Sequence, residues 1–184
     1  MIRRISLVLL LCSASPAFAQ DFAREGFSLG AGLSFASEEF DDDGFDFDDT
    51  WGAMLSGGYR FHPNFALEGR FEHTGDFEGD AGSVDADINI WTLTANAQFF
   101  MLTGQFQPYL IGGLGIGEVE VDVDTPFGGG SDDEDDLIWR LGIGVDAYVS
   151  NNVVLGVEAA YNFGTNDLDD LDYWTATALV KYRF

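Results

Sequence analysis

The chain has 184 residues, of which 32 are acidic and 8 basic, so its formal net charge at pH 7 is −24. This balance excludes the basic footprint of a nucleic-acid-binding protein, and an aromatic content of 15% argues against a disordered acidic chain. Hydrophobic residues make up 46% of the sequence while the mean hydropathy is only +0.02. That combination is typical of strands that alternate apolar and polar residues.

The first nineteen residues predict a secretory signal peptide. Arg3 and Arg4 supply its positive start, residues 5–11 its apolar core, and the run Ala17-Phe18-Ala19 its small-x-small cleavage site. The mature domain is therefore expected to span residues 20–184. The one cysteine, Cys12, lies in this leader, so no disulfide is expected in the mature protein.

Eight segments of the mature chain alternate apolar and polar residues with the period of two that marks β-strands. They cover approximately residues 27–35, 51–61, 65–72, 91–99, 109–121, 139–149, 153–163 and 174–184. The fifth is ambiguous, because the glycines between residues 112 and 117 permit either register, and a β-bulge is one solution. Most of these segments have the length of a tilted strand that crosses a bilayer.

The connections between these segments are alternately long and short. Long gaps cover residues 37–50, 74–88, 122–136 and 164–172, whereas short turns fall near residues 62–64, 102–106 and 150–152. In membrane barrels the short turns face the periplasm and the long loops face outward. The pattern predicts an all-β fold, an eight-stranded antiparallel up-and-down transmembrane β-barrel with both termini in the periplasm.

Aromatic residues gather at both ends of the predicted strands, as the two interfaces of a bilayer require. The predicted girdle residues are Trp51, Trp91, Trp139, Trp174, Tyr59, Phe61, Tyr109 and Tyr182. Five of the six basic residues after the leader fall on the opposite, inward face, since a lipid-facing Arg or Lys would cost ~2–4 kcal/mol at mid-bilayer. A soluble barrel with its apolar face turned inward is the alternative, but it leaves the aromatic rims unexplained.

The inward face is expected to carry a network of opposite charges. Its members are Arg60, Glu68, Arg70, Glu72, Arg140, Asp146, Glu158, Lys181 and Arg183. An eight-stranded barrel is only wide enough for side chains to fill, so one interpretation is a structural plug of paired charges. The other is a gate, in which Glu68 and Glu158 compete for Arg70 and Arg140 and thereby open a narrow ion path.

The last residues place Val180, Tyr182 and Phe184 at alternate positions, and this ending resembles the C-terminal assembly signal of bacterial outer-membrane barrels. The run from Pro108 to Gly115 is similar to the Pro-Tyr-x-x-Gly-x-Gly fifth strand of the same group. The whole chain resembles the superfamily that includes OmpA-type transmembrane domains and opacity-type porins. The resemblance implies a Gram-negative outer membrane, contact with its lipid and lipopolysaccharide, and recognition by the barrel-assembly machinery.

Dense carboxylates in the predicted loops suit either a saline environment or weak binding of divalent cations, which could bridge the loops to lipopolysaccharide. The cation candidates are Asp41, Asp42, Asp43, Asp132, Asp133 and Asp135. Their spacing is not that of an EF-hand, and no cofactor is expected.

Three functions are compatible with these features. The first is a non-enzymatic barrel with a structural, surface-interaction or adhesion role through long acidic loops. The second is a small, low-conductance channel gated by the lumen charges. The third, a lipid-remodelling enzyme, is disfavoured because His62 and His73 lack the His-x-Ser spacing of outer-membrane lipid A deacylases, so no catalytic residue is assigned.

Overall fold

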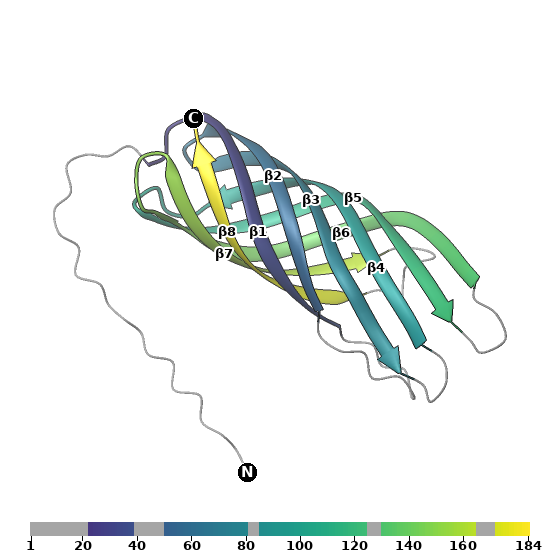
Figure 1. The fold of residues 1–184 in the computed structure, drawn as a ribbon. Coiled ribbons are helices and arrows are strands. Elements are labelled where there is room, and N and C mark those ends of the chain that lie inside the picture. Colours follow the sequence, from purple (N-terminus) through teal and green to yellow (C-terminus); the bar gives the residue numbers. More distant parts are fainter. Residues whose placement is uncertain (1–21, 39–49, 81–84, 125–129, 165–171) are drawn as a thin grey trace, which may run out of the picture.

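The structure, a computed structural model, describes residues 22–38, 50–80, 85–124, 130–164 and 172–184. These residues form eight strands (Figure 1). Their bounds are β1 Gly26–Glu38, β2 Thr50–His62, β3 Phe65–Asp80, β4 Asp85–Phe100, β5 Phe106–Asp124, β6 Gly130–Tyr148, β7 Val153–Gly164 and β8 Tyr173–Arg183. Within these ranges there is no helix long and apolar enough to cross a membrane.

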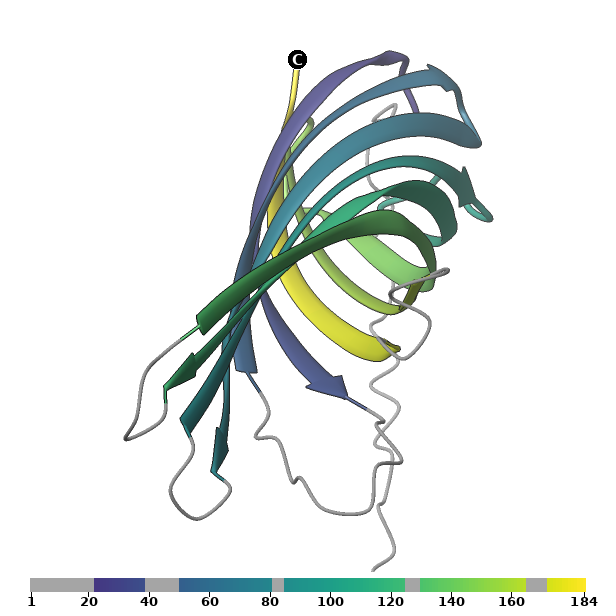
Figure 2. The same ribbon diagram turned by 90° about the vertical axis from the view of Figure 1, so that its right-hand side faces the viewer.

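Each strand pairs with the next in antiparallel fashion, and β8 returns to pair with β1, for example through Leu29 and Tyr182. Closure removes the free edges that a sheet would otherwise leave within the hydrocarbon of a membrane. The predicted fold class is confirmed. Figures 1 and 2 show the strands wrapping around a single axis with a strong tilt.

The barrel has apolar side chains on its outer wall and charged side chains inside. In β6 the outward Leu141 is 55% exposed, whereas its neighbour Arg140 is 2% exposed. The same alternation runs through β2 and β8. A soluble barrel has the reverse polarity, so the alternative with an apolar interior is wrong. Slipping any strand by one residue would exchange its two faces, which fixes the register.

The ambiguous fifth strand has one continuous register, without a bulge along its pairs with β4 and β6. Tyr109 and Ile111 are buried inside, and Leu114 and Ile116 are exposed on the outer wall. The prediction that Tyr109 belongs to the membrane girdle is therefore wrong. Its ring fits over Gly144, its neighbour on β6, where a Cβ would overlap the ring carbon that bears the hydroxyl.

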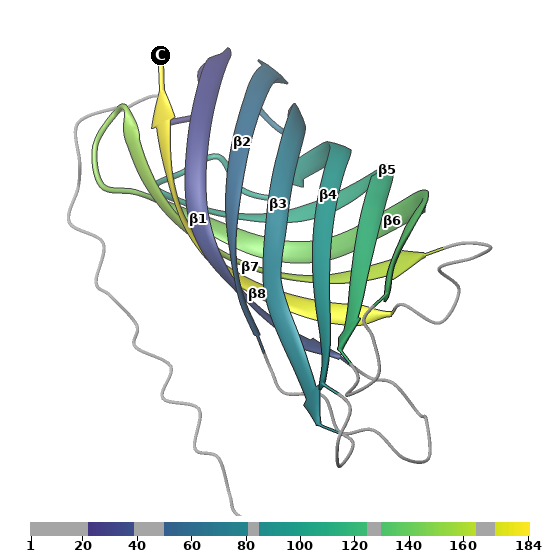
Figure 3. The same ribbon diagram turned by 45° about the vertical axis from the view of Figure 1, so that its right-hand side comes forward.

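Two of the predicted long loops are largely strands. Residues 74–80 and 85–88 belong to β3 and β4, and residues 122–124 and 130–136 belong to β5 and β6. These strands continue past the tryptophans, and the two hairpins project beyond the rest of the barrel (Figures 1 and 3). Most of the first and last predicted loops, 39–49 and 165–171, lies outside the described residues.

The short connections agree with the prediction and lie at the opposite end of the barrel. They join β2 to β3 through Pro63 and Asn64, β4 to β5 through residues 101–105, and β6 to β7 through residues 149–152. We call this end, which also holds the C-terminus, the turn end. The end with the four tryptophans and the projecting strands is the hairpin end.

Candidate functional site: the charged lumen

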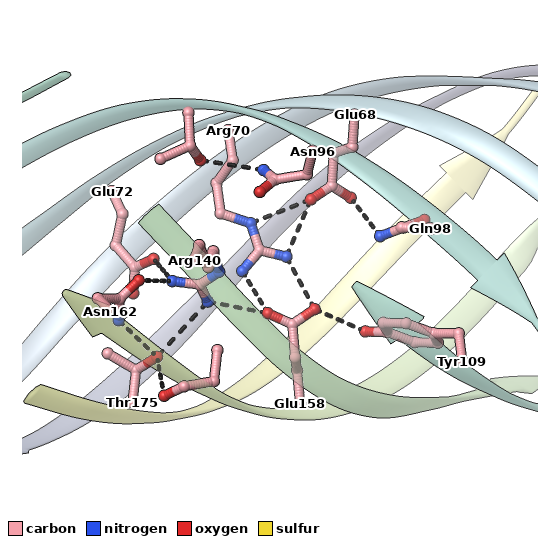
Figure 4. Close-up of polar contacts among 12 residues, drawn as sticks. Glu68, Arg70, Glu72, Asn96, Gln98, Tyr109, Arg140, Glu158, Asn162 and Thr175 are labelled. Atoms are coloured by element: carbon pink, nitrogen blue, oxygen red, sulfur yellow. Dashed lines mark hydrogen bonds and ion pairs between the residues drawn. The ribbon is translucent and has the colours of Figure 1, made fainter. Parts of the chain in front are cut away.

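Alternate residues of β3, β6 and β7 bring five charged side chains together inside the barrel (Figure 4). They are Glu68, Arg70 and Glu72 from β3, Arg140 from β6 and Glu158 from β7. All five are at most 6% exposed. Because side chains of a strand alternate between its two faces, the same register that turns the apolar residues outward aims these groups at the barrel axis.

Glu158 is the centre of this cluster and accepts hydrogen bonds from three side chains. Arg70 binds it with both terminal nitrogens, at 2.6 Å to Oε1 and 3.0 Å to Oε2. Arg140 donates Nη2–H to Oε1 at 2.9 Å, and the Tyr109 hydroxyl donates to Oε2 at 2.8 Å. Such charge-assisted, two-pronged contacts are the strongest hydrogen bonds that side chains make.

The two arginines are each shared between two carboxylates. Arg70 also pairs with Glu68 at 2.9 Å, and Arg140 also pairs with Glu72 at 3.3 Å. Figure 4 shows each guanidinium lying between its two carboxylates. The predicted competition between Glu68 and Glu158 for Arg140 is absent from the described contacts, because Glu68 binds Arg70 and not Arg140.

Neutral side chains complete the cluster. Gln98 donates to the second oxygen of Glu68 at 3.1 Å, and Asn162 accepts from Arg140 at 2.8 Å. The charge pattern of the sequence did not indicate these two side chains or Tyr109 as lumen residues. For Gln98 and Asn162 the available signal was their inward position in the strand alternation, whereas the open register of the fifth strand gave none for Tyr109. Buried ions persist only when further hydrogen bonds satisfy them, so these partners belong to the site.

A second group of charges lies toward the turn end. Lys181 donates to both oxygens of Asp146, at 3.2 and 3.1 Å. Arg60 donates to the Gln107 amide oxygen at 2.7 Å and to the carbonyl of Pro63, and its guanidinium lies 4.0 Å from the centre of the Phe100 ring.

Arg183 ties the beginning of the described chain into the turn end. It donates to the carbonyl of Phe22 and to the Tyr148 hydroxyl, both at 2.6 Å, and to the carbonyl of Arg24. The ring of Phe22 packs on Tyr148, with centroids 5.1 Å apart. Phe22 therefore covers part of the turn end of the lumen, which nothing in the strand pattern predicted.

The other predicted site residues are distributed as follows. Exposed aromatic side chains at the hairpin end are Trp51, Trp91, Trp139 and Trp174, and those at the turn end are Tyr59, Phe61 and Tyr182. Val180 and Phe184 are also exposed on the outer wall. Of the cation candidates, Asp132, Asp133 and Asp135 lie in β6. The other three, Asp41, Asp42 and Asp43, lie outside the described residues. Among the described residues there is no group of three or more His, Cys, Asp or Glu side chains that could hold a metal ion.

An inside-out, eight-stranded barrel with a charged lumen defines the class of bacterial outer-membrane barrels. The family model of the outer membrane protein beta-barrel domain matches residues 5–184. The chain therefore belongs to this family of outer-membrane proteins.

Several solved structures share the fold. Ail, the attachment invasion locus protein of Yersinia pestis, is 23% identical over 88% of this chain and 100% of that one, with a TM-score of 0.67. Neisserial surface protein A is 18% identical over 86% and 97%, with a TM-score of 0.67. OprG from Pseudomonas aeruginosa is 18% identical over 90% and 98%, with a TM-score of 0.61. Comparison with curated protein sequences gives no match.

Proposed function

We propose that the protein is a non-enzymatic barrel that contacts partner proteins outside the cell through its projecting strands. In the proposed orientation, the hairpin end faces the outside of the cell and the turn end faces the periplasm. This follows the class, in which long connections lie outside and short turns lie in the periplasm. We define the hairpin-end sheet as residues 75–80, 85–89, 119–124 and 130–136. The observation that carries the proposal is a pair of strand edges, here called open, that have no further strand neighbour among the described residues.

The first open edge belongs to β3 and the second to β6. Among the described residues, the pairing of β2 with β3 reaches Gly52 and Thr74, and that of β6 with β7 reaches Ile138 and Gly164, the last described residue of β7. Beyond these pairs, within the described ranges, residues 77–80 pair with β4 alone, after an irregularity at residues 75–76, and residues 130–136 pair with β5 alone. An open edge presents unpaired amides and carbonyls, to which an extended segment of another protein adds as a further strand.

The charge of the sheet favours a basic partner. The chain has no Lys or Arg between Arg70 and Arg140, and residues 132–136 are all acidic. Like charges discourage the pairing of two copies of this edge, whereas an extended Lys- or Arg-rich segment would be attracted to it. Ail of Yersinia pestis has been solved with the heparin analogue sucrose octasulfate. We propose that this acidic chain does not bind such a sulfated ligand.

Proline substitutions on β6 test whether binding uses the strand edge. Successive backbone amides of a strand point to opposite sides, and proline has no amide hydrogen to donate. One of the two substitutions Asp133→Pro and Glu134→Pro therefore removes an amide on the open edge, and the other removes an amide that faces β5. We expect one of the two to weaken binding of an extended basic peptide to whole cells by tenfold or more. The matched controls Asp133→Asn and Glu134→Gln remove one charge each and should weaken it by less than threefold. Equal effects of all four substitutions would contradict strand addition.

Contacts with the membrane and with the assembly machinery form part of the same proposal. The apolar wall would lie against membrane lipid and, near the tryptophans, against lipopolysaccharide. The exposed Val180, Tyr182 and Phe184 would be read during insertion. Whole-cell fractionation of a Phe184→Ser variant tests this, since reduced outer-membrane levels are expected.

A small, low-conductance channel is a second candidate, favoured by the charged interior of the lumen. Arg70 and Arg140 each contact two carboxylates of the lumen. A change of these ion-pair partners is the step that would open a path for a permeating ion. Replacing Arg140 with Ala removes one side of this network. The channel hypothesis expects a change of single-channel conductance in planar bilayers, and negligible conductance in both forms would exclude it.

An enzymatic role has little support from the described histidines. The ring of His73 stacks on Trp91 with centroids 3.8 Å apart, and Nδ1 of His62 accepts a hydrogen bond from the Asn64 amide. A nucleophile needs a positioned base. We propose that the protein does not remodel lipid, and unchanged lipid A masses with and without the protein would support this.

A further inference from the structure

Two of the five lumen cations, Arg60 and Arg183, form no ion pair with a carboxylate in the described part of the chain. The three others, Arg70, Arg140 and Lys181, all do. Both exceptions are 4% exposed, and their hydrogen bonds go to neutral oxygens. A buried charge that has no counter-charge is unfavourable in a low-dielectric interior, so the turn end of the lumen favours an added negative charge.

A cavity of about 20 Å³ lies beside these cations. Three cations line it, Arg60, Lys181 and Arg183, against two carboxylates, Asp146 and Glu68. Both carboxylates are already engaged, Asp146 by Lys181 and Glu68 by Arg70 and Gln98. The charged groups around the cavity therefore sum to one positive charge.

The cavity also has a hydrogen-bond donor beside it that the described residues leave unused. Nε of Arg60 is buried and has no hydrogen-bond partner among them. The hydroxyl of Tyr148, which lines the same cavity, contacts both Arg60 and Arg183. Net positive charge, an unused N–H and a polar hydroxyl are the features that hold a small anion.

We propose that this cavity binds one small monovalent anion, chloride in size and charge, close to Nε of Arg60. The volume admits a particle about the size of one water molecule. Chloride is only modestly larger, whereas sulfate, phosphate and organic carboxylates are excluded by size. A water molecule is the neutral alternative, which would leave the positive charge uncompensated.

The position of Phe22 indicates how the anion would be retained. Its carbonyl accepts from Arg183 and from the Gln107 amide, and its ring contacts Tyr148. Phe22 thus contacts Arg183 and Tyr148, two residues that line the cavity, and we expect it to slow exchange of the anion with solvent at the turn end. Phe22→Gly should speed exchange without removing the cations that bind the anion.

Thermal unfolding of the protein folded in detergent micelles tests the proposal. The comparison is sodium chloride against sodium gluconate and sodium sulfate at equal ionic strength, so that general screening is the same. We expect chloride to raise the midpoint of unfolding with saturation, gluconate to give no such rise, and sulfate to give only the steady, non-saturating rise that follows from its exclusion from protein surfaces. Arg60→Gln should abolish the chloride effect, whereas the control Glu118→Gln, on an exposed residue, should retain it. Indistinguishable curves in chloride and gluconate would mean water only and would overturn the proposal.

A second measurement does not depend on the variant folding. Crystals of the unaltered protein grown in sodium bromide should give an anomalous peak within hydrogen-bonding distance of Nε of Arg60. An anomalous map with no peak in the lumen would contradict the anion site.

Discussion

Glu158 is the residue on which most lumen contacts converge. It accepts from Arg70, Arg140 and Tyr109, which come from three other strands. Removing one partner of a buried ion pair lowers the free energy of unfolding by far more than the intact pair contributes to it, because the remaining charge stays buried without a counter-charge. Here a single substitution would affect two arginines at once.

We therefore expect Glu158→Gln to lower the free energy of unfolding by about 3–5 kcal/mol, the range found when one partner of a buried pair is removed. Urea unfolding in micelles measures it. The same substitution at Glu118, which is exposed on β5, is the control and should change stability by less than about 0.5 kcal/mol. Similar values for the two variants would show that the lumen network is not what stabilises the barrel.

Tyr109 shows where strand alternation can be misread at a single position. It was assigned to the wall because aromatic residues collect near strand ends, yet its hydroxyl binds Glu158 and its ring covers Gly144. The absence of a side chain at Gly144 makes room for the ring, a relation between two strands that residue type alone does not reveal. The charged members of the lumen could be predicted, because lipid strongly disfavours them on the other face.

Gly144→Ala should displace the Tyr109 ring and break its hydrogen bond to Glu158, at a cost of about 1–3 kcal/mol for overpacking. Gly57→Ala is the matched control, because its Cβ would lie 3.6 Å from Leu29 in ordinary contact. Tyrosine fluorescence and urea unfolding follow the two effects. Equal stability of both variants would contradict the fit of Tyr109 against Gly144.

At the scale of elements, strand register was predictable for every strand except the glycine-rich fifth, whereas strand length was not. Register follows from polarity within the membrane, where each residue faces either lipid or the lumen. Beyond the tryptophans this constraint ends, and residues 118–124, which alternate acidic residues with valines, were interpreted as loop because of their charge. In the structure the same residues extend β5, paired to β4 and β6. Backbone pairing outweighed the repulsion of neighbouring carboxylates.

Hydrogen exchange distinguishes the two descriptions of this region. Residues 85–89 and 119–124 have strand neighbours on both sides, whereas 75–80 and 130–136 have one each among the described residues. We expect slower amide exchange in the first pair of segments than in the second, measured by mass spectrometry in micelles. Equally fast amide exchange in all four segments would contradict the strands and would agree with the prediction that these residues form loops.

At the scale of the molecule, the barrel is a membrane protein because its polarity is reversed. Large apolar side chains such as Leu55, Leu141 and Val157 are more than half exposed on the wall, and all nine predicted lumen charges are buried. In water such a wall would be an aggregating surface, whereas in a bilayer it contacts hydrocarbon. Phe22, which covers part of the lumen, could not be predicted, because its place depends on the closed barrel and not on any local pattern.

Refolding of the leaderless chain with and without detergent tests this polarity most directly. The account predicts a folded, monodisperse protein only when detergent or lipid is present, with a gel mobility that changes on heating. A chain that stays folded and monodisperse in plain buffer would contradict it.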